Sequence, residues 1–287
     1  MKIARYWTRA AGEAVDPRGG RIRVTARGWS DESIDAARIC ARETAGRVAR
    51  RIVTQPNAPR YPYGDRPLPE PILSEFREGG SLSAAITRNA YGAQVMNATQ
   101  MMFVDIDRQD AAAAPQAALK GLFSGVFGKP AASPAKVVDP VLEAVGKVVE
   151  RQRLSARVYR TAAGHRVLIT DRPFAAKTAE AEALLHEFRA DPLYVRLCRL
   201  QESFRARLTP KPWRLGFRQP PVEFPFETPA DQSRFQDWER EYESKAVGYA
   251  TCAYRTSFGT GDVLPEFDAL IRFHDETTKA ASGLPLA

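Results

Sequence analysis

The stretch MMFVDID at residues 101–107 is the most informative part of the chain, because an apolar run leads directly into two acids. Its aromatic and β-branched residues favour a buried strand over a helix. Strand side chains alternate, so Asp105 and Asp107 should point to the same side. Two such carboxylates repel each other unless a cation or proton lies between them, and oxygen ligands suit Mg²⁺ or Mn²⁺. We therefore predict a metal site here. Replacing both aspartates with alanine should abolish binding of the divalent ion and leave the fold intact. The alternative is that one acid caps the end of the strand and the other is merely solvated.

A second informative stretch is RVYRTAAGHRVLIT at residues 157–170. Two alternating segments flank the small residues Ala-Ala-Gly, which predicts a β-hairpin with a basic tip. Backbone N–H groups in a small-residue turn can approach a phosphate closely. The alternative is an ordinary hairpin with solvated arginines. The candidate phosphate-binding residues of this hairpin are Arg160, Thr161, Gly164, His165 and Arg166.

The third stretch is SFRARLTPKPWR at residues 203–214. On a strand, Arg205 and Arg207 share one side, and Lys211 follows in a proline-stiffened turn beside an indole. Arginine offers a planar fork to phosphate, so replacing Arg205 with Lys should weaken nucleotide binding with little effect on stability. We expect Arg205 or Arg207 to point into one cleft with the two aspartates; the alternative is a structural corner whose arginines pair with acids of helices.

The remaining pattern predicts an α+β fold, since helices and strands alternate without a regular βαβ period. Helices are expected over residues 30–52, 71–78, 136–153, 177–189, 192–202, 231–246 and 264–281, with extended structure over 84–98 and 246–256. A weak helix followed by a flexible insertion is expected within 109–135. The expected regions are a helical N-terminal region with a proline-rich connector over 1–83, a core over 84–218, and a helix–strand–helix region packed on that core over 219–287.

Charge is unevenly distributed along the 287 residues, which carry 42 basic and 34 acidic side chains and a net charge of +8. Counting along the chain gives +6 for residues 1–51, +9 for residues 151–218 and −6 for residues 219–287. A concentrated basic block is typical of a polyanion-binding surface, although arginine-rich codon usage gives the same excess.

No apolar run is long enough for a membrane span, and the N-terminus lacks the apolar core of a secretory signal. The three cysteines are far apart and odd in number, which predicts a reducing, cytoplasmic location rather than a disulfide framework. The pair His274–Asp275 is typical of metal-dependent phosphohydrolases, but three histidines in the whole chain are too few to complete their metal site.

Together, MFVDID, TAAGHRVLIT and FRARLTPKPW resemble the motif series of the archaeo-eukaryotic primase superfamily over about residues 84–215. The similarity is closest to primase-polymerases and to the polymerase domain of bacterial end-joining ligases. The whole chain also resembles a group of bacterial proteins that share the R-x-R-L-T-P-K-P-W run, a likeness that implies no activity. The primase resemblance implies a mixed sheet flanked by helices, with metal-binding acids and a turn that binds nucleotide phosphates.

Carried over residue by residue, the resemblance makes Asp105 and Asp107 the metal ligands and Asp191 the candidate third catalytic acid. The family histidine falls on Arg166 if Gly164 takes the family glycine position, and on His165 if the alignment shifts by one residue. Arg205 and Arg207 resemble the later basic strand, so with Arg166 and Lys211 they would hold the triphosphate and template.

Three functions follow as expectations. The first is a metal-dependent, primase-like nucleotidyltransferase using Mg²⁺ or Mn²⁺, with nucleic acid and nucleoside triphosphate as partners and no membrane. The second is a catalytically degenerate relative that only binds nucleic acid. The third is an unrelated small-molecule or structural protein. Mg²⁺ or Mn²⁺ binding separates the first from the second, and salt-dependent nucleic-acid binding separates both from the third.

Overall fold

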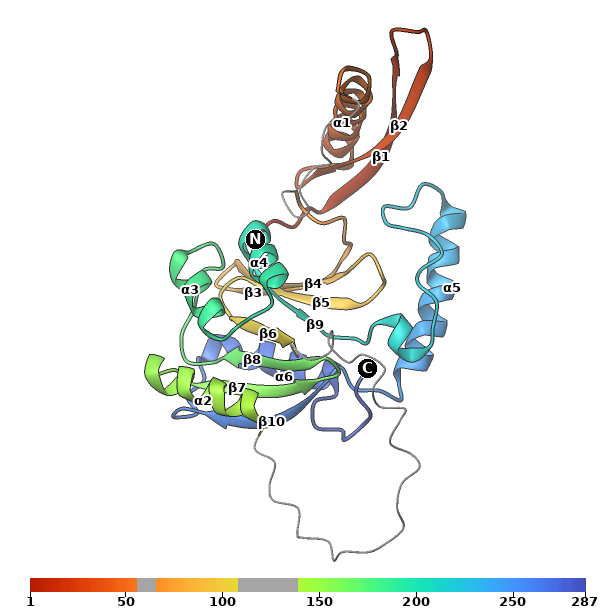
Figure 1. The fold of residues 1–287 in the computed structure, drawn as a ribbon. Coiled ribbons are helices and arrows are strands. Elements are labelled where there is room, and N and C mark those ends of the chain that lie inside the picture. The colour runs from red at the N-terminus through yellow and green to blue at the C-terminus, as the bar shows by residue number, and fades with distance from the viewer. Residues whose placement is uncertain (56–65, 108–138) are drawn as a thin grey trace, which may run out of the picture.

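The computed structural model describes residues 1–55, 66–107 and 139–287, and within them the chain is α+β (Figure 1). The expected insertion within 109–135 lies outside the described residues, as does most of the proline-rich connector. In chain order the elements are β1 (Tyr6–Val15), β2 (Arg21–Ser30), α1 (Ile34–Thr54), β3 (Ile72–Glu78), β4 (Ser81–Arg88), β5 (Gln94–Ala98), β6 (Phe103–Asp107), α2 (Pro140–Gln152), β7 (Ala156–Thr161), β8 (Gly164–Ile169), α3 (Ala179–Glu187), α4 (Pro192–Gln201), β9 (Phe204–Arg207), the 3₁₀ helix η3 (Pro212–Leu215), α5 (Pro229–Ala246), β10 (Cys252–Phe258) and α6 (Pro265–Thr278).

Two four-stranded sheets form the body of the molecule. One has the strand order β3-β4-β5-β9 and the other β10-β7-β8-β6, and the edge strands β6 and β9 lie against each other. Every ladder between the described strands is antiparallel, so the expected mixed sheet is wrong. The predicted strand over MMFVDID is confirmed as β6, and its meeting with β9 brings the first and third sequence motifs together.

A single apolar core joins the two sheets to their helices. Phe103 and Val104 of β6 are completely buried, as are Val167 of β8 and Phe204 of β9. Helix α2 adds Val145 and its neighbouring valines to the same core, and α3, α4 and α6 add the apolar residues of their inward faces. Because β6 is buried except at the partly exposed Asp105 and the exposed Asp107, the two aspartates stand where the core opens to solvent.

β1, β2 and α1 form an arm that projects from the body, called here the N-terminal arm (Figure 1). Ser33 caps α1, and a stripe of buried alanines faces the hairpin. A Cβ on Gly12 would lie 2.5 Å from the carbonyl carbon of Ala45, and one on Gly28 would lie 2.1 Å from the backbone nitrogen of Ala41. The helix therefore rests directly on the backbone of the hairpin.

Helix α5 stands beside the body and is anchored to the turn between β4 and β5. Gly92 has a φ of +90°, and a Cβ there would lie 2.1 Å from the ring of Trp238. The buried guanidinium of Arg88 pairs with Glu239 and Glu243 of the same helix. These contacts fix α5 against β4 and the turn that follows it.

The structure corrects two expectations for the N-terminal region. Residues 71–78 form the strand β3, not a short helix, because Gly79 and Gly80 take positive φ values and turn the chain back into β4. The region before residue 34 is a β-hairpin, not helical structure. Its sequence signal is the turn at Asp16–Gly20, in which the Asp16 carboxylate accepts backbone hydrogen bonds from Arg18 and Gly20.

The remaining predicted elements are confirmed with small shifts of their ends. These are α1, the β4–β5 and β7–β8 hairpins, α2, the α3–α4 pair broken at Asp191, β9, and the helix–strand–helix order of residues 219–287. β3 lies before the expected boundary at residue 84 and β10 lies after the one at 218, so both sheets draw strands from the flanking regions.

Among the described residues, no helix combines the length and apolar character needed to cross a lipid bilayer.

Candidate functional site

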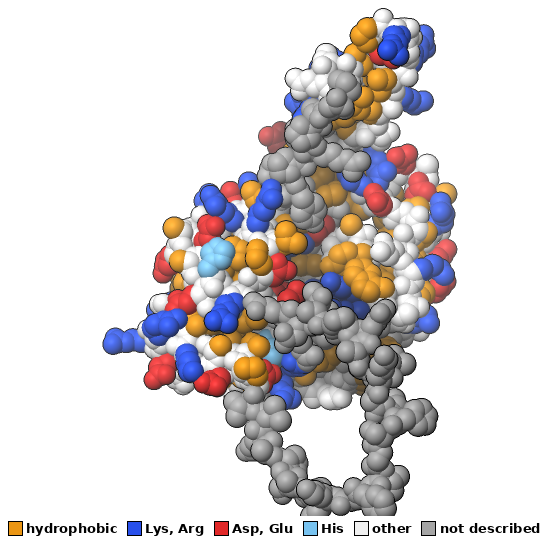
Figure 2. Space-filling model, viewed as in Figure 1, with side chains coloured by type: hydrophobic (Ala, Val, Ile, Leu, Met, Phe, Trp, Pro, Cys, Tyr) orange, Lys and Arg blue, Asp and Glu red, His pale blue; other side chains and the backbone are white. Residues whose placement is uncertain are grey.

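A cleft of about 1110 Å³ opens where β6 and β9 meet and continues to the base of the N-terminal arm. Figure 2 shows the molecule hollowed between the arm and the body, with acidic and basic side chains close together there. The sequence-predicted site residues that line this cleft are Asp105, Asp107, Thr161, His165, Arg166, Asp191, Arg205, Arg207 and Lys211.

Three aspartates from two elements meet on one wall of the cleft. Asp105 and Asp107 stand at the end of β6, and the backbone N–H of Asp191 donates a 3.1 Å hydrogen bond to the carbonyl of Asp105. Asp191 is the N-cap of α4, and its Oδ1 lies 2.7 Å from the backbone nitrogen of Leu193. Burial raises the pKa of Asp107, and the charges of Asp191 and Asp105 raise it further. The predicted grouping of these three acids is thus present.

Arg166 does not face the cleft as a free phosphate ligand. Its side chain is 1% exposed, and its Nε donates a 2.9 Å hydrogen bond to Oδ1 of Asp105, its partner across the β6–β8 ladder. The guanidinium also donates to the carbonyl of Arg207, which ties the two sheets together at their adjoining edges. Asp105 neutralises this buried cation. We therefore expect the loss of Asp105 to destabilise the fold, contrary to the expectation from sequence that the fold stays intact.

His274 of α6 continues this buried network. Its ring is fully buried, and its Nδ1 lies 2.9 Å from Oδ1 of Asp275 while its Nε2 lies 3.4 Å from the Nη1 of Arg166. A proton on Nδ1 donates to the carboxylate, which leaves Nε2 to accept from the arginine. Burial lowers the pKa of His274, in keeping with a neutral ring. His274, held by Asp275, therefore positions Arg166.

The tip of the β7–β8 hairpin is used structurally. Nε2 of His165 lies 2.9 Å from Oδ2 of Asp139, the N-cap of α2, and Arg160 points to the same carboxylate at 3.8 Å. A Cβ on Gly164 would lie 2.0 Å from the carbonyl oxygen of Ile106, so this glycine admits the neighbouring strand rather than a ligand. Thr161 accepts a hydrogen bond from the backbone of Gly164. Among these, Thr161 and His165 still line the cleft and Arg160 does not.

Arg205 lines the cleft but is held by an acid. Its Nη2 donates to both carboxylate oxygens of Glu70, at 2.8 and 3.0 Å, and its Nη1 donates to Asn97. Glu70 is 6% exposed and also accepts a short hydrogen bond from Thr87. Sequence reasoning considered only acids close to Arg205 in the chain and missed Glu70. Arg205 is therefore already paired with a buried acid, and this pair ties the connector to β9.

Three cations form the wall opposite the aspartates. Within the described part of the chain, no carboxylate lies within ion-pair distance of Arg207, Lys211 or Arg214. Burial and the neighbouring charge of Arg166 lower the pKa of Arg207 to about 10. Burial, followed by Arg207 and Arg214, lowers the pKa of Lys211. One Nη of Arg214 is buried without a hydrogen-bond partner. The wall thus concentrates positive charge that no acid of the described residues pairs with directly.

An exposed indole stands beside these cations. Trp213 of η3 is 48% exposed, and the ammonium of Lys211 lies 5.3 Å from its ring centroid. Tyr91, which lines the cleft, packs edge-on against the same indole at 5.2 Å. A half-exposed indole fixed by a second ring is a suitable stacking surface for a base.

The acid wall fits a divalent cation with few protein ligands. Within the described residues, no group of three or more His, Cys, Asp or Glu side chains is arranged to hold a metal. Mg²⁺ is commonly held by one or two carboxylates together with substrate phosphates, and Asp107 and Asp191 provide such a pair. Burial and the charges of Asp191 and Asp105 raise the pKa of Asp107 more than Lys211 and Arg214 lower it, so a cation bound here would stabilise its carboxylate. Asp105 is already engaged by Arg166.

We expect Asp107→Asn to raise the melting temperature slightly at neutral pH, because it removes a carboxylate that the fold disfavours. A pKa raised in the folded state makes stability fall as pH rises through that pKa. The gain in stability of the variant over wild type should therefore reach its maximum above the raised pKa of Asp107 and vanish below about pH 3.9, the ordinary pKa of aspartate. Thermal unfolding of both proteins across this range checks the prediction; a variant less stable than wild type at neutral pH contradicts it.

The chain matches no known protein-family model, no curated protein and no solved structure.

Proposed function

We propose that the protein is a metal-dependent nucleotidyltransferase of the primase-polymerase kind, acting on nucleic acid. The observation that carries the proposal is the charge pattern of the cleft, where Asp107 and Asp191 line the same cavity as cations that have no acid within ion-pair distance among the described residues. A nucleoside triphosphate with its metal ions has the complementary pattern. The resemblance of the three sequence motifs to the primase superfamily points the same way.

In this proposal the cations bind and orient the triphosphate. Arg207 and Arg214 offer planar forks for phosphate oxygens, and Lys211 adds a point charge between them. Trp213 lies next to Lys211 and provides a ring on which the base can stack. The binding wall therefore comes from β9 and η3, and the reacting groups meet at the end of β6.

The chemistry assigned to this site is transfer of a nucleoside monophosphate to a hydroxyl group. The hydroxyl oxygen forms a bond to the α-phosphorus, its proton leaves, and the bond from that phosphorus to pyrophosphate breaks. Because Asp107 is assigned here as a metal ligand, the hydroxyl proton passes to a water molecule in the cleft. A divalent ion held by Asp107 and Asp191 would stabilise charge on the attacking and leaving oxygens. Arg207 and Lys211 would hold the departing pyrophosphate.

A second candidate function is nucleic-acid binding without catalysis. The observation that favours it is the buried pair Asp105–Arg166, which engages one of the two motif aspartates with a cation of the protein itself. With Asp105 neutralised in this way, the cleft keeps its cations, with the Trp213 ring beside Lys211, but has fewer ligands for metal. Such a protein would bind single strands and show no dependence on Mn²⁺.

Primer extension distinguishes the two candidates. The purified protein should extend a labelled primer on a template with nucleoside triphosphates and Mn²⁺, and Asp107→Asn should abolish the activity because it removes the least compensated carboxylate. Asp237→Asn, an exposed aspartate on α5, is a matched control that should extend normally. An Asp107→Asn variant as active as wild type would refute the assigned site. No extension, together with strand binding that is unaffected by Mn²⁺, would favour the second candidate.

A further inference from the structure

The hairpin of the N-terminal arm has a face that α1 does not cover. α1 packs against Gly12 and Gly28, so the residues at the alternate positions point to the other side, called here the outer face. Its cross-strand pairs, from base to tip, are Trp7–Trp29, Arg9–Arg27, Ala11–Thr25, Glu13–Arg23 and Val15–Arg21. Arginine thus occupies four of these ten positions, and Glu13 is the one acid among them.

The outer face continues the cleft that holds the aspartates. Trp7, Arg9, Thr25, Arg27 and Trp29 line the same cavity. From there, Arg23 and Arg21 extend toward the tip of the arm at intervals of two residues, about 6.6 Å on a strand. This spacing is close to the distance between successive phosphates of an extended single strand, and both side chains are exposed.

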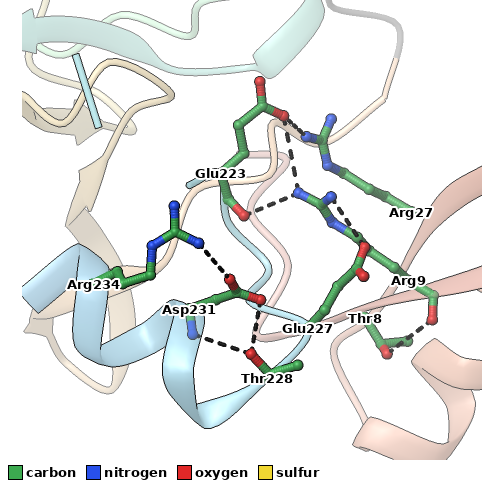
Figure 3. A network of polar contacts seen from close by, with 8 residues as sticks. All are labelled: Thr8, Arg9, Arg27, Glu223, Glu227, Thr228, Asp231 and Arg234. Atoms are coloured by element: carbon green, nitrogen blue, oxygen red, sulfur yellow. Dashed lines mark hydrogen bonds and ion pairs between the residues drawn. The ribbon is translucent and has the colours of Figure 1, made fainter. Parts of the chain in front are cut away.

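Two glutamates from the segment before α5 cover the arginines nearest the cleft (Figure 3). Arg27 pairs with the carboxylate of Glu223, and Arg9 donates to Glu227 at 3.3 Å and to the backbone carbonyl of Glu223 at 2.9 Å. The side chains of Glu223 and Glu227 are 67% and 54% exposed, so water screens these ion pairs. The Nε groups of Arg9 and Arg27 are buried without a hydrogen-bond partner. The arginines therefore keep donors that their glutamate partners leave unused.

We infer that the outer face binds the phosphate backbone of a single-stranded nucleic acid, and that Glu223 and Glu227 occupy Arg9 and Arg27 until phosphates displace them. The inference rests on the proposed function, since it supplies the path by which a template strand reaches the acid wall. Phosphate oxygens offer both arginines the paired acceptors that fit a guanidinium fork. The exposed Arg21 and Arg23 would capture the strand first, with Arg23 leaving its exposed 3.9 Å ion pair with Glu13, and Arg9 and Arg27 would then engage the strand at the entrance of the cleft.

The first test replaces the two exposed arginines nearest the tip of the arm, Arg21 and Arg23. Arg21→Gln with Arg23→Gln should weaken binding of a labelled single-stranded oligonucleotide at least tenfold at low salt. Each phosphate contact on a single strand contributes about 0.7 to the slope of log affinity against log salt concentration, so the slope should fall by about 1.4. Arg38→Gln with Arg42→Gln is the matched control, with the same charge loss on the exposed side of α1. Equal effects of the two double variants would overturn the inference.

The second test replaces Glu223 and Glu227, which pair with Arg9 and Arg27, and it should change oligonucleotide affinity in the opposite direction. Glu223→Gln with Glu227→Gln should increase affinity for the same oligonucleotide severalfold, because it frees Arg9 and Arg27 and removes two charges beside the strand. A purely structural role for these ion pairs predicts unchanged or weaker binding. Unchanged or weaker binding by this variant would overturn the masking role, and tighter binding of a blunt duplex than of the single strand would overturn the choice of ligand.

A nucleotide measurement separates this inference from the proposed function. Binding of a nucleoside triphosphate with Mn²⁺, measured by calorimetry, should be the same in wild type and in the Arg21/Arg23 double variant, since neither residue lines the cleft. Loss of strand binding with intact nucleotide binding supports the outer face as the strand site. Absence of nucleotide binding in wild type counts against the proposed function, whatever the arm variants do.

Discussion

Asp105→Ala should lower the free energy of unfolding by about 3–5 kcal/mol, because it leaves the guanidinium of Arg166 buried without a counter-charge. The side chain of Arg166 is 1% exposed, whereas that of Asp105 is 33% exposed. Attraction to Asp105 raises the pKa of Arg166 despite its burial, so the arginine cannot escape by losing its proton. The two remaining partners of Arg166, the Arg207 carbonyl and the His274 ring, are uncharged.

Urea denaturation at neutral pH measures this effect, and two further variants make it specific. Asp107→Ala removes the same kind of side chain two residues away and should not destabilise the fold. Replacing both members of the pair, Asp105→Leu with Arg166→Met, should cost less than Asp105→Ala alone, since no buried charge is then left unpaired. If Asp105→Ala is no more destabilising than Asp107→Ala, the buried pair does not have the role given to it here.

Arg205→Met and Arg207→Met should have opposite effects, although the two arginines are two residues apart on β9. Arg205 neutralises Glu70, so its loss should lower the free energy of unfolding by about 3–5 kcal/mol and leave the nucleotide affinity of the folded protein unchanged. Arg207 has no acid partner among the described residues, and burial disfavours its charge. Its loss should therefore not lower stability but should weaken triphosphate binding about 10- to 100-fold, as expected when a charged hydrogen bond is removed.

Denaturation curves and nucleotide calorimetry on both variants test this division. Glu70→Gln provides an independent check, because it breaks the Arg205 pair from the other side without touching β9. It should destabilise the protein and spare nucleotide binding, like Arg205→Met. A loss of nucleotide affinity in Arg205→Met, with none in Arg207→Met, would reverse the roles assigned to these arginines.

Local patterns were sufficient to predict most of the body. β6 could be recognised because its apolar and β-branched residues are consecutive, and the β7–β8 hairpin because a small-residue turn separates two alternating segments. The β1–β2 hairpin was missed because its strands are rich in Ala, Gly and Arg, which have little strand preference. The strands have glycines where α1 packs because a side chain at Gly12 or Gly28 would collide with the backbone of the helix.

The acid wall of the site was predictable, but the pairing of its cations was not. Asp105 and Asp107 share a strand, so their alternation alone places them together. The partner of Arg205 lies 135 residues away in sequence, at the end of the connector, and no local spacing indicates it. Likewise, Arg166 faces Asp105 only through the register of β6 with β8. Ion pairs of this range depend on topology, which the motifs do not contain.

The close contact of α1 with Gly12 and Gly28 has a mechanical consequence. The N-terminal arm should be rigid, because α1 lies directly on the backbone of the β1–β2 hairpin and neither can bend without compressing the other. Its strands of ten residues are about 33 Å long, so a rotation of the arm by about 10° at its base would displace its tip by about 6 Å. The ion pairs of Glu223 and Glu227 lie near the base of the arm, so a rotation of the arm would move Arg9 and Arg27 relative to the segment that leads into α5.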